Sequence, residues 1–164
     1  MSDLKIENYV STDNLLQNCE GVVAYEGEPN SNSAIHFCKG DILLSNIRPY
    51  LKKLWLADRD GGCNPDVLVI HTTDSGFLPE FLYYILSKQS FFDYVMTDVK
   101  GMKMPRGNKE HIMRYNIPDI PLSEQRTAVS QARTLEMQIE EAQQVMASCA
   151  ARKRAVLDKY LNKN

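Results

Sequence analysis

The stretch LSEQRTAVSQARTLEMQIEEAQQVMASCAARKRAVLDKYLN (residues 122–162) decides the fold class of this chain of 164 residues. It contains neither glycine nor proline, and Ser123 is a residue type that commonly caps the N-terminus of a helix. The stretch therefore predicts one uninterrupted helix from Ser123 to Asn162, about 57 Å long at roughly 1.5 Å per residue. Because so long a helix cannot pack wholly on a small domain, we divide the chain into a domain at 1–121 and a helix at 122–164.

Apolar and small residues recur along this helix at alternating spacings of four and three. The recurring positions are Ala128, Ala132, Leu135, Ile139, Ala142, Met146, Cys149, Lys153, Val156 and Tyr160. Such a heptad seam is typical of helices that pair in a coiled coil. The alternative is that this face of the helix packs on the domain of the same chain.

Lys153 indicates how two such helices would run. In a parallel pair, Lys153 would face its own copy and alanines would stack on alanines, which leaves gaps. In an antiparallel pair centred near Gln144, small residues meet large ones in most layers, as dense packing requires. Those layers are Ala128 with Tyr160, Ala132 with Val156, Leu135 with Lys153, Ile139 with Cys149, and Ala142 with Met146. The seam therefore predicts an antiparallel homodimer.

The residues before the helix predict a mixed α/β domain. Apolar and β-branched runs separated by turn residues predict strands at 22–25, 41–45, 54–57, 66–72 and 113–118. Apolar residues at helical spacing predict a helix that begins near Pro79, and Ser90 with Asp93 predicts a capping box for a second short helix. Glycines predict a turn at 60–62, and an irregular loop is expected at 100–109. The expected fold class is α+β, a compact mixed α/β domain followed by one long coiled-coil helix.

Charge is distributed unevenly along the chain. The formal net charge is −2, and the apolar fraction of 43 % is that of a folded globular protein. Residues 1–35 carry one base against six acids, a net −5, whereas 100–116 carry five bases against one acid, a net +4. Because phosphates respond to local clusters of charge, the basic segment keeps DNA among the candidate partners. No apolar run could cross a bilayer and the N-terminus does not resemble a signal peptide, so we expect a cytoplasmic protein.

The cysteines do not form a metal-binding pattern. Cys19, Cys38, Cys63 and Cys149 are widely scattered, without a C-x-x-C pair, and we expect free, mostly buried thiols. His36 lies two residues before Cys38, and on a strand the two side chains would share a face. A third and a fourth ligand are not evident in the sequence, so no metal site is predicted.

Two basic clusters are the candidate DNA contacts. They comprise Arg48, Tyr50, Lys52 and Lys53, and Lys100, Lys103, Arg106 and Lys109. Arginine and lysine bind phosphate, while Asn46, Asn108 or an arginine could reach base edges. The alternative interpretation of these clusters is solvated surface charge. The aromatic residues fall within predicted strands and helices, so we assign most of them to the core and not to base stacking.

The sequence does not support catalysis. Asn64-Pro65-Asp66 is not the Asn-Pro-Pro-aromatic motif of adenine methylation, and no glycine-rich loop follows a strand to hold S-adenosylmethionine. A nuclease of the Pro-Asp…Asp-x-Lys kind would use Asp66 with Asp98 and Lys100. That chemistry needs 98–100 on a strand beside Asp66, whereas this segment falls at the end of a predicted helix. We therefore expect no catalytic residues and no cofactor.

Three stretches of the chain resemble the specificity subunits of type I restriction-modification enzymes. They are GDILLSNIRPYLKKLWLADRDGGCNPDVLVI (40–70), EFLYYILS…FFDYVMTDVKGMKMPRGNK (80–109), and YNIPDIPLSEQ (115–125) leading into the long helix. The opening ENYVSTDNLLQNCEGV (7–22) also resembles the start of many such recognition domains. The resemblance implies a target-recognition domain whose loops enter DNA grooves and a spacer helix that pairs with another antiparallel helix.

The resemblance also implies partners. In this family the specificity subunit binds double-stranded DNA and docks onto methyltransferase subunits, which carry the S-adenosylmethionine chemistry, and onto a motor and nuclease subunit. The usual subunit holds two recognition domains and two helices, so this sequence corresponds to a half-length form that is either a fragment or self-associates. The other hypothesis is a truncated relative that assembles through its helix without binding DNA.

The chain departs from the family pattern in three places. A glycine-containing strand that usually precedes Glu7 is missing. Met102 stands where threonine is common, and Ile120 replaces the first proline of the usual Pro-Pro before Leu122. The missing second half puts the two-part, asymmetric recognition of the family in doubt.

Overall fold

A computed structural model of the chain describes residues 6–29, 33–72 and 76–161. The chain divides into two compact units, Met1–Gln125 and Arg126–Asn164.

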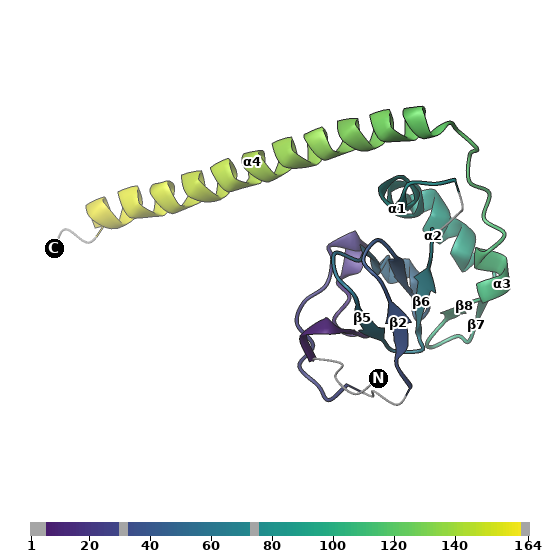
Figure 1. Ribbon diagram of the computed structural model, residues 1–164. Helices are drawn as coiled ribbons and strands as arrows, with labels where there is room; N and C mark the ends of the chain where they lie inside the picture. Colours follow the sequence, from purple (N-terminus) through teal and green to yellow (C-terminus); the bar gives the residue numbers. More distant parts are fainter. Residues whose placement is uncertain (1–5, 30–32, 73–75, 162–164) are drawn as a thin grey trace. The chain divides into compact units, whose positions relative to one another are not determined.

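The first unit contains two three-stranded sheets (Figure 1). In one sheet, β5 (Gly61–Cys63) lies between β1 (Tyr9–Val10), which is parallel to it, and β2 (Ile35–Phe37), which is antiparallel. In the other, β3 (Ile42–Ser45) lies between β4 (Leu54–Leu56) and β6 (Val67–Ile70), both antiparallel to it. The strands predicted at 41–45, 54–57 and 66–72 are therefore confirmed, with shorter ends.

The central strand β3 separates two apolar cores. Leu43 belongs to the core between the two sheets, where the rings of Phe37 and Trp55 meet edge to face with their centroids 5.9 Å apart. Ile42 and Leu44 point the other way, into a core completed by helices. Because successive side chains of a strand face opposite sides, a strand buried on both faces is a continuous apolar run, as Ile-Leu-Leu is here.

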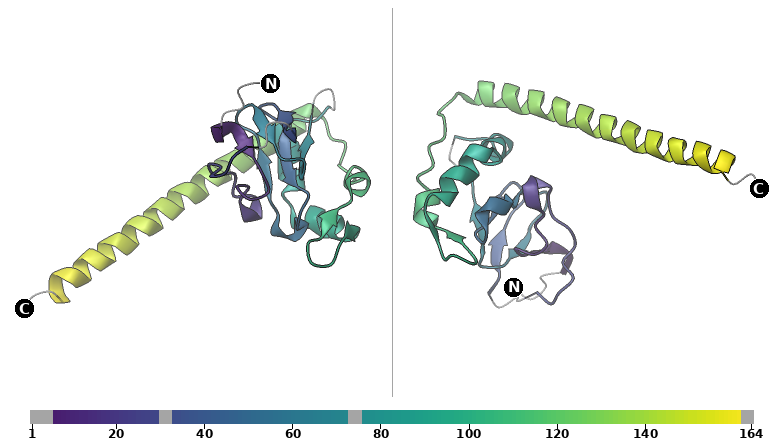
Figure 2. Two further views of the ribbon diagram at one scale, coloured as in Figure 1. Left: turned by 90° about the horizontal axis from the view of Figure 1, so that it is seen from below. Right: turned by 180° about the vertical axis from the view of Figure 1, so that it is seen from behind.

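α-Helices complete the described part of the first unit (Figure 2). They are α1 (Pro79–Leu86), α2 (Gln89–Met96) and the single turn α3 (Lys109–Ile112). The first two bury Phe81, Leu82, Ile85 and Leu86, and Phe91, Phe92 and Val95. Both predicted helices are confirmed. The predicted capping box is wrong, because α2 begins at Gln89 and the N-cap residue Lys88 makes no side-chain capping bond.

The glycines of 60–62 do not form the predicted turn. Gly61 and Gly62 lie in β5, paired with β2 and β1. A Cβ atom on Gly61 would collide with the carbonyl oxygen of Asn8 and would lie 2.7 Å from the ring of Phe37. Glycine is required here because backbone and ring approach β5 closely, a tertiary reason that turn statistics do not contain.

Two further strand predictions are wrong. In 22–25, only Val22 makes a bridge, with Leu15, and the carbonyl of Val23 accepts a hydrogen bond from the Asn14 side chain at 2.9 Å. The segment 113–118 contains no strand, because the N–H groups of Arg114 and Tyr115 donate back to the carbonyls of His111 and Ile112 and continue the turn at the end of α3. Both segments are apolar enough for a strand but have no partner strand at the required register.

The thiols are free, as predicted, but they are not mostly buried. Cys63 is buried and Cys19 is half-buried, whereas Cys38 and Cys149 are exposed. The Sγ atom of Cys38 lies 3.9 Å from Nδ1 of His36 at the surface. Among the described residues, no group of three or more histidine, cysteine, aspartate or glutamate side chains is arranged to hold a metal ion.

The helix α4 (Leu122–Leu161) is one uninterrupted element of 40 residues. It begins one residue before the predicted cap, so Ser123 lies inside the helix and the capping prediction is wrong. A mixed α/β unit followed by one long helix confirms the predicted fold class. In the described part of the chain, no helix combines the length and the apolar character needed to span a bilayer.

Candidate nucleic-acid interface

Backbone hydrogen bonds join three segments that lie far apart in the sequence. The N–H of Arg48 donates to the carbonyl of Pro105 at 2.7 Å, and the N–H of Gly107 donates to the carbonyl of Asn46 at 3.0 Å. The N–H of Asn46 donates in turn to the carbonyl of Asp66 at 2.8 Å. The two basic clusters predicted from the sequence therefore meet here. We call the set formed by residues 46–48, Asp66 and 99–107 the basic platform.

The segment 99–107 is a hairpin and not the predicted irregular loop. Its strands, β7 (Val99–Lys100) and β8 (Arg106–Gly107), pair antiparallel beside α3 (Figure 1). The turn between them begins with Gly101, whose φ of 89° is costly for other residues. Lys100 thus lies on a strand, so the expectation that 98–100 ends a helix is wrong for this residue.

Asn46 and Gly107 pack against each other at the centre of the basic platform. A Cβ atom on Gly107 would lie 2.8 Å from Oδ1 of Asn46 and 3.1 Å from Cδ1 of Ile112. Asn46 is 9 % exposed, and its Oδ1 is buried without a hydrogen-bond partner among the described residues. Asn46 therefore supports the backbone of the platform and does not project toward solvent, as a residue that contacts base edges would.

Asn108 also has a structural role. Its Oδ1 accepts the N–H of Glu110 at 3.1 Å, which caps α3, and its Nδ2 donates to Oδ2 of Asp98 at 2.8 Å. Both polar ends of the amide are occupied by the protein, so in this structure Asn108 does not present a free edge to a base.

Arg106 is held by an ion pair. Its Nη2 lies 3.2 Å from Oδ2 of Asp66, with side-chain exposures of 57 % and 33 %. An exposed pair of this kind contributes at most about 1 kcal/mol to stability. Its larger effect is orientation, because it fixes one side of the guanidinium and leaves the other toward solvent.

Two left-handed residues bracket the short helix η4 (Pro49–Leu51) beside this hairpin. Arg48 has φ 50° and Lys52 has φ 52°, which costs a non-glycine residue roughly 1 kcal/mol. Strained backbone of this kind is common at functional sites. Arg48 and Tyr50 are both exposed, Tyr50 to 49 %.

The eight candidate DNA contacts do not all gather in one place. Arg48, Lys100, Lys103 and Arg106 belong to the basic platform, and the first three make no ion pair within the described residues. Three lysines have protein neighbours of another kind. Lys52 Nζ donates to Oε1 of Gln89 at 2.9 Å, Lys53 Nζ donates to the carbonyl of Thr12 at 2.5 Å, and Lys109 lines an apolar pocket of about 320 Å³ with Ile112 and Met113.

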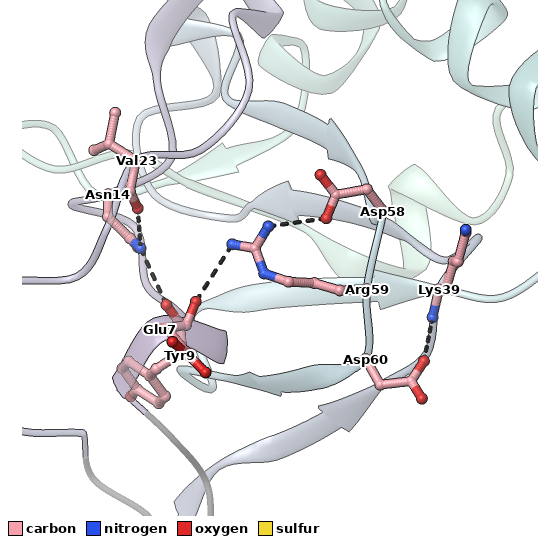
Figure 3. Close-up of polar contacts among 8 residues, drawn as sticks. All are labelled: Glu7, Tyr9, Asn14, Val23, Lys39, Asp58, Arg59 and Asp60. Carbon is pink, nitrogen blue, oxygen red and sulfur yellow. Dashed lines mark hydrogen bonds and ion pairs between the residues drawn. The ribbon is translucent and has the colours of Figure 1, made fainter.

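The opposite end of the sheet has a different electrostatic character. Figure 3 shows Arg59 with Nη1 2.8 Å from Oδ1 of Asp58 and Nη2 directed to the carbonyl of Glu7, and Lys39, whose backbone N–H donates to Asp60 at 2.7 Å. The guanidinium of Arg59 also lies over Trp55, 5.0 Å from the ring centroid. At this end of β3 the charged groups of Arg59, Asp58 and Asp60 are bound by other groups of the protein. The other end of β3 leads into the basic platform.

The carboxylates considered for a nuclease are engaged by other side chains. Asp66 pairs with Arg106, and Asp98 accepts the amide of Asn108.

Of the thiols, burial raises the pKa of Cys63 to about 12, and burial raises the pKa of Cys19 despite the nearby ammonium of Lys52. Both therefore stay protonated at neutral pH.

Sequence reasoning missed the role of Asp66. It entered only as a carboxylate of a hypothetical nuclease, and no local signal pairs it with Arg106, which lies 40 residues later. It also missed the exposed tip of the hairpin, where Met102 stands clear of the unit. The signal in the sequence is an apolar residue, Met102, between Lys100 and Lys103 in a loop that contains glycine.

Comparisons with known proteins show which sequences and folds this chain is similar to. No family model matches the chain. Over 109 residues it is 31 % identical to the type I restriction enzyme EcoDI specificity subunit of Escherichia coli, a match that covers 66 % of this chain and 24 % of the relative.

Two solved structures have the same fold, with a TM-score of 0.70 and 23 % identity each. One is the HsdS subunit from Thermoanaerobacter tengcongensis, and the match covers 92 % of this chain and 41 % of that chain. The other was described in work on complex assembly and conformational transition of the type I R-M system, with 93 % and 41 % covered. The chain thus spans about two fifths of the solved structures and a quarter of the curated relative. The chain is therefore similar in sequence to a type I restriction enzyme specificity subunit, and it has the fold of these two solved structures.

Proposed function

We propose that this chain is a non-catalytic DNA-recognition module, which directs the methyltransferase and restriction subunits of a type I complex to a DNA target. The observation that carries the proposal is the basic platform. Four cations, Arg48, Lys100, Lys103 and Arg106, project from segments that main-chain hydrogen bonds fix to one another. Fixed cations at one end of a unit are suited to contacts with successive phosphates.

Salt dependence tests this assignment. The chain is titrated against a labelled duplex at several salt concentrations, with Lys103→Ala, inside the basic platform, and Lys39→Ala, outside it, as a matched pair of exposed lysines. Loss of one phosphate contact lowers the slope of log K against log salt by about 0.9. We expect that decrease for Lys103→Ala and an unchanged slope for Lys39→Ala. Equal effects of the two variants, or wild-type chain that does not bind DNA, would contradict the proposal.

The pattern of methylated bases in the genome tests the same function independently. Sequencing of methylated bases with and without the gene should reveal one methylated motif that disappears when the gene is removed. An unchanged set of methylated motifs would count against a role in directing methylation.

Purified chain with Mg²⁺ should neither nick nor methylate DNA, and activity that depends on Asp66 or Asp98 would overturn the non-catalytic assignment.

We further propose that two copies pair through α4 as an antiparallel coiled coil. In the single chain, the large apolar residues of the seam are exposed: Leu135, Ile139, Met146, Val156 and Tyr160 are each between 56 % and 72 % accessible. Burial of these side chains against a second copy would remove apolar surface from water. A two-fold pair would present identical recognition surfaces in opposite directions, so the DNA target would be an interrupted palindrome.

Light scattering and distance measurements test this pairing. At tens of micromolar, the mass should be twice the 18.7 kDa of one chain. Labels at position 128 of the two chains should lie about 48 Å apart along the antiparallel helices, at roughly 1.5 Å per residue. A monomer, or labels at position 128 that lie close together, would exclude the antiparallel dimer.

A further inference from the structure

The tip of the β7–β8 hairpin combines two features that rarely occur together at a protein surface. Met102 is completely exposed and Met104 is half-exposed, although methionine is an apolar residue that is usually buried. Cations surround them, since Lys103 lies between the two methionines and Lys100 and Arg106 lie on the strands below.

The base of the hairpin is fixed from three sides. β7 and β8 pair with each other, Arg48 N–H donates to the carbonyl of Pro105, and Gly107 N–H donates to the carbonyl of Asn46. The ion pair between Arg106 and Asp66 adds a side-chain contact. These bonds hold the two strands in place and leave the apolar tip exposed.

We propose that Met102 is an apolar wedge, which enters a groove of duplex DNA and opens a base step while the surrounding cations bind the flanking phosphates. Proteins that deform DNA commonly insert a methionine, leucine or phenylalanine between bases, and the larger protein surface that the bent duplex covers offsets the loss of stacking. The flexible, polarisable side chain of methionine suits this role, because it adapts to the faces of the bases.

Charge complementarity identifies DNA as what covers Met102. An apolar protein partner would be expected to bury methionines with few charges around them, since cores of interfaces are depleted in lysine. Here three cations lie within four residues of Met102, which matches a polyanion whose interior is apolar. The inference rests on the proposed DNA-binding function and adds a deformation of the duplex to it.

The test begins with selection of duplexes by the full chain from a random library. 2-Aminopurine, whose fluorescence rises when it is unstacked, then replaces single adenines of the selected site in turn. We expect the wild-type chain to raise the fluorescence at one step. Met102→Ser should abolish this rise, and Met102→Leu should retain it because an apolar side chain of similar size is kept.

Met113→Ser is the matched control, since Met113 is also exposed in the same unit but does not belong to the hairpin. It should leave the fluorescence rise unchanged. If the wild-type chain selects no duplex, the proposed function fails and the wedge fails with it. If the chain selects and binds a duplex but no step unstacks, or if Met102→Ser retains the rise, the wedge alone is overturned.

Discussion

The side-chain amide of Gln125 is bonded to the backbone of Leu78, with Oε1 accepting the N–H of Leu78 at 2.9 Å. Its Nε2 donates to the carbonyls of Gly76 at 3.0 Å and Ile120 at 2.9 Å. The side chain is 1 % exposed, so all three bonds are buried. One glutamine thus joins the first turn of α4 to the segment that leads into α1, within the first unit.

Replacement of Gln125 by alanine should therefore destabilise the first unit by about 2 to 3 kcal/mol. Three backbone groups lose a partner, and a buried polar group without a partner costs roughly 1 to 3 kcal/mol. Gln138→Ala, at an exposed position of α4, should stay within about 0.5 kcal/mol of wild type. Urea unfolding followed by circular dichroism measures both, and equal midpoints for the two variants would refute the importance of the Gln125 bonds.

Arg48→Gly should separate stability from DNA binding. Glycine accepts φ 50° without penalty, so the free energy of unfolding should rise by about 1 kcal/mol, while loss of the guanidinium should weaken binding to duplex DNA. Lys52→Gly, with φ 52°, relieves the same strain but removes a lysine that donates to Gln89. Its DNA affinity should stay close to wild type. Thermal unfolding and DNA titration decide, and the prediction fails if Arg48→Gly retains full affinity.

Gly107→Ala should damage the basic platform from within. The added Cβ would press on Oδ1 of Asn46 and on Ile112, which we expect to cost about 1 to 3 kcal/mol. Because the carbonyl of Asn46 accepts the N–H of Gly107, a shift there also displaces Arg48 from the hairpin, and DNA affinity should fall. Gly27→Ala meets only the end of the Tyr25 side chain and should stay within about 0.5 kcal/mol of wild type. Normal DNA affinity of Gly107→Ala would argue against a rigid platform.

Lys153→Leu should tighten the proposed dimer. In the antiparallel layers Lys153 faces Leu135 in two symmetry-related places, so leucine would replace two charges with apolar contacts. Analytical ultracentrifugation should show a dissociation constant about tenfold lower, given roughly 0.8 kcal/mol for each buried methylene group. Arg152→Leu lies off the seam and should have little effect. A weaker dimer after Lys153→Leu would mean that another face of the helix is paired.

The Cys63 thiol should make the stability of the first unit depend on alkaline pH. Its pKa is raised from 9.0 to about 12 because the group is buried, so the unfolded chain loses this proton at lower pH than the folded chain does. The stabilising contribution is complete below pH 9 and is lost as pH rises toward 12. We expect the wild-type free energy of unfolding to fall more steeply over this window than that of Cys63→Ala. Parallel pH profiles of the two proteins would refute this assignment.

Local patterns determined much of this protein. The long helix follows from a stretch without glycine or proline, because a helix closes its hydrogen bonds within one segment. The run Ile42-Leu43-Leu44 predicts a strand that is buried on both faces, because successive side chains of a strand point to opposite faces and all three of these are apolar. The two basic clusters are likewise visible as composition, and they contain every cation of the basic platform.

Only the tertiary structure decided how these parts meet. Gly61 lies in a strand because Phe37 and Asn8 approach it, and Asp66 holds Arg106 because the ends of the neighbouring strands β3 and β6 meet the hairpin. The segment 22–25 has the residues of a strand but no partner strand. In each case the deciding contact joins residues far apart in the chain, and a sequence pattern records a residue's own preference but not the neighbour that the fold brings to it.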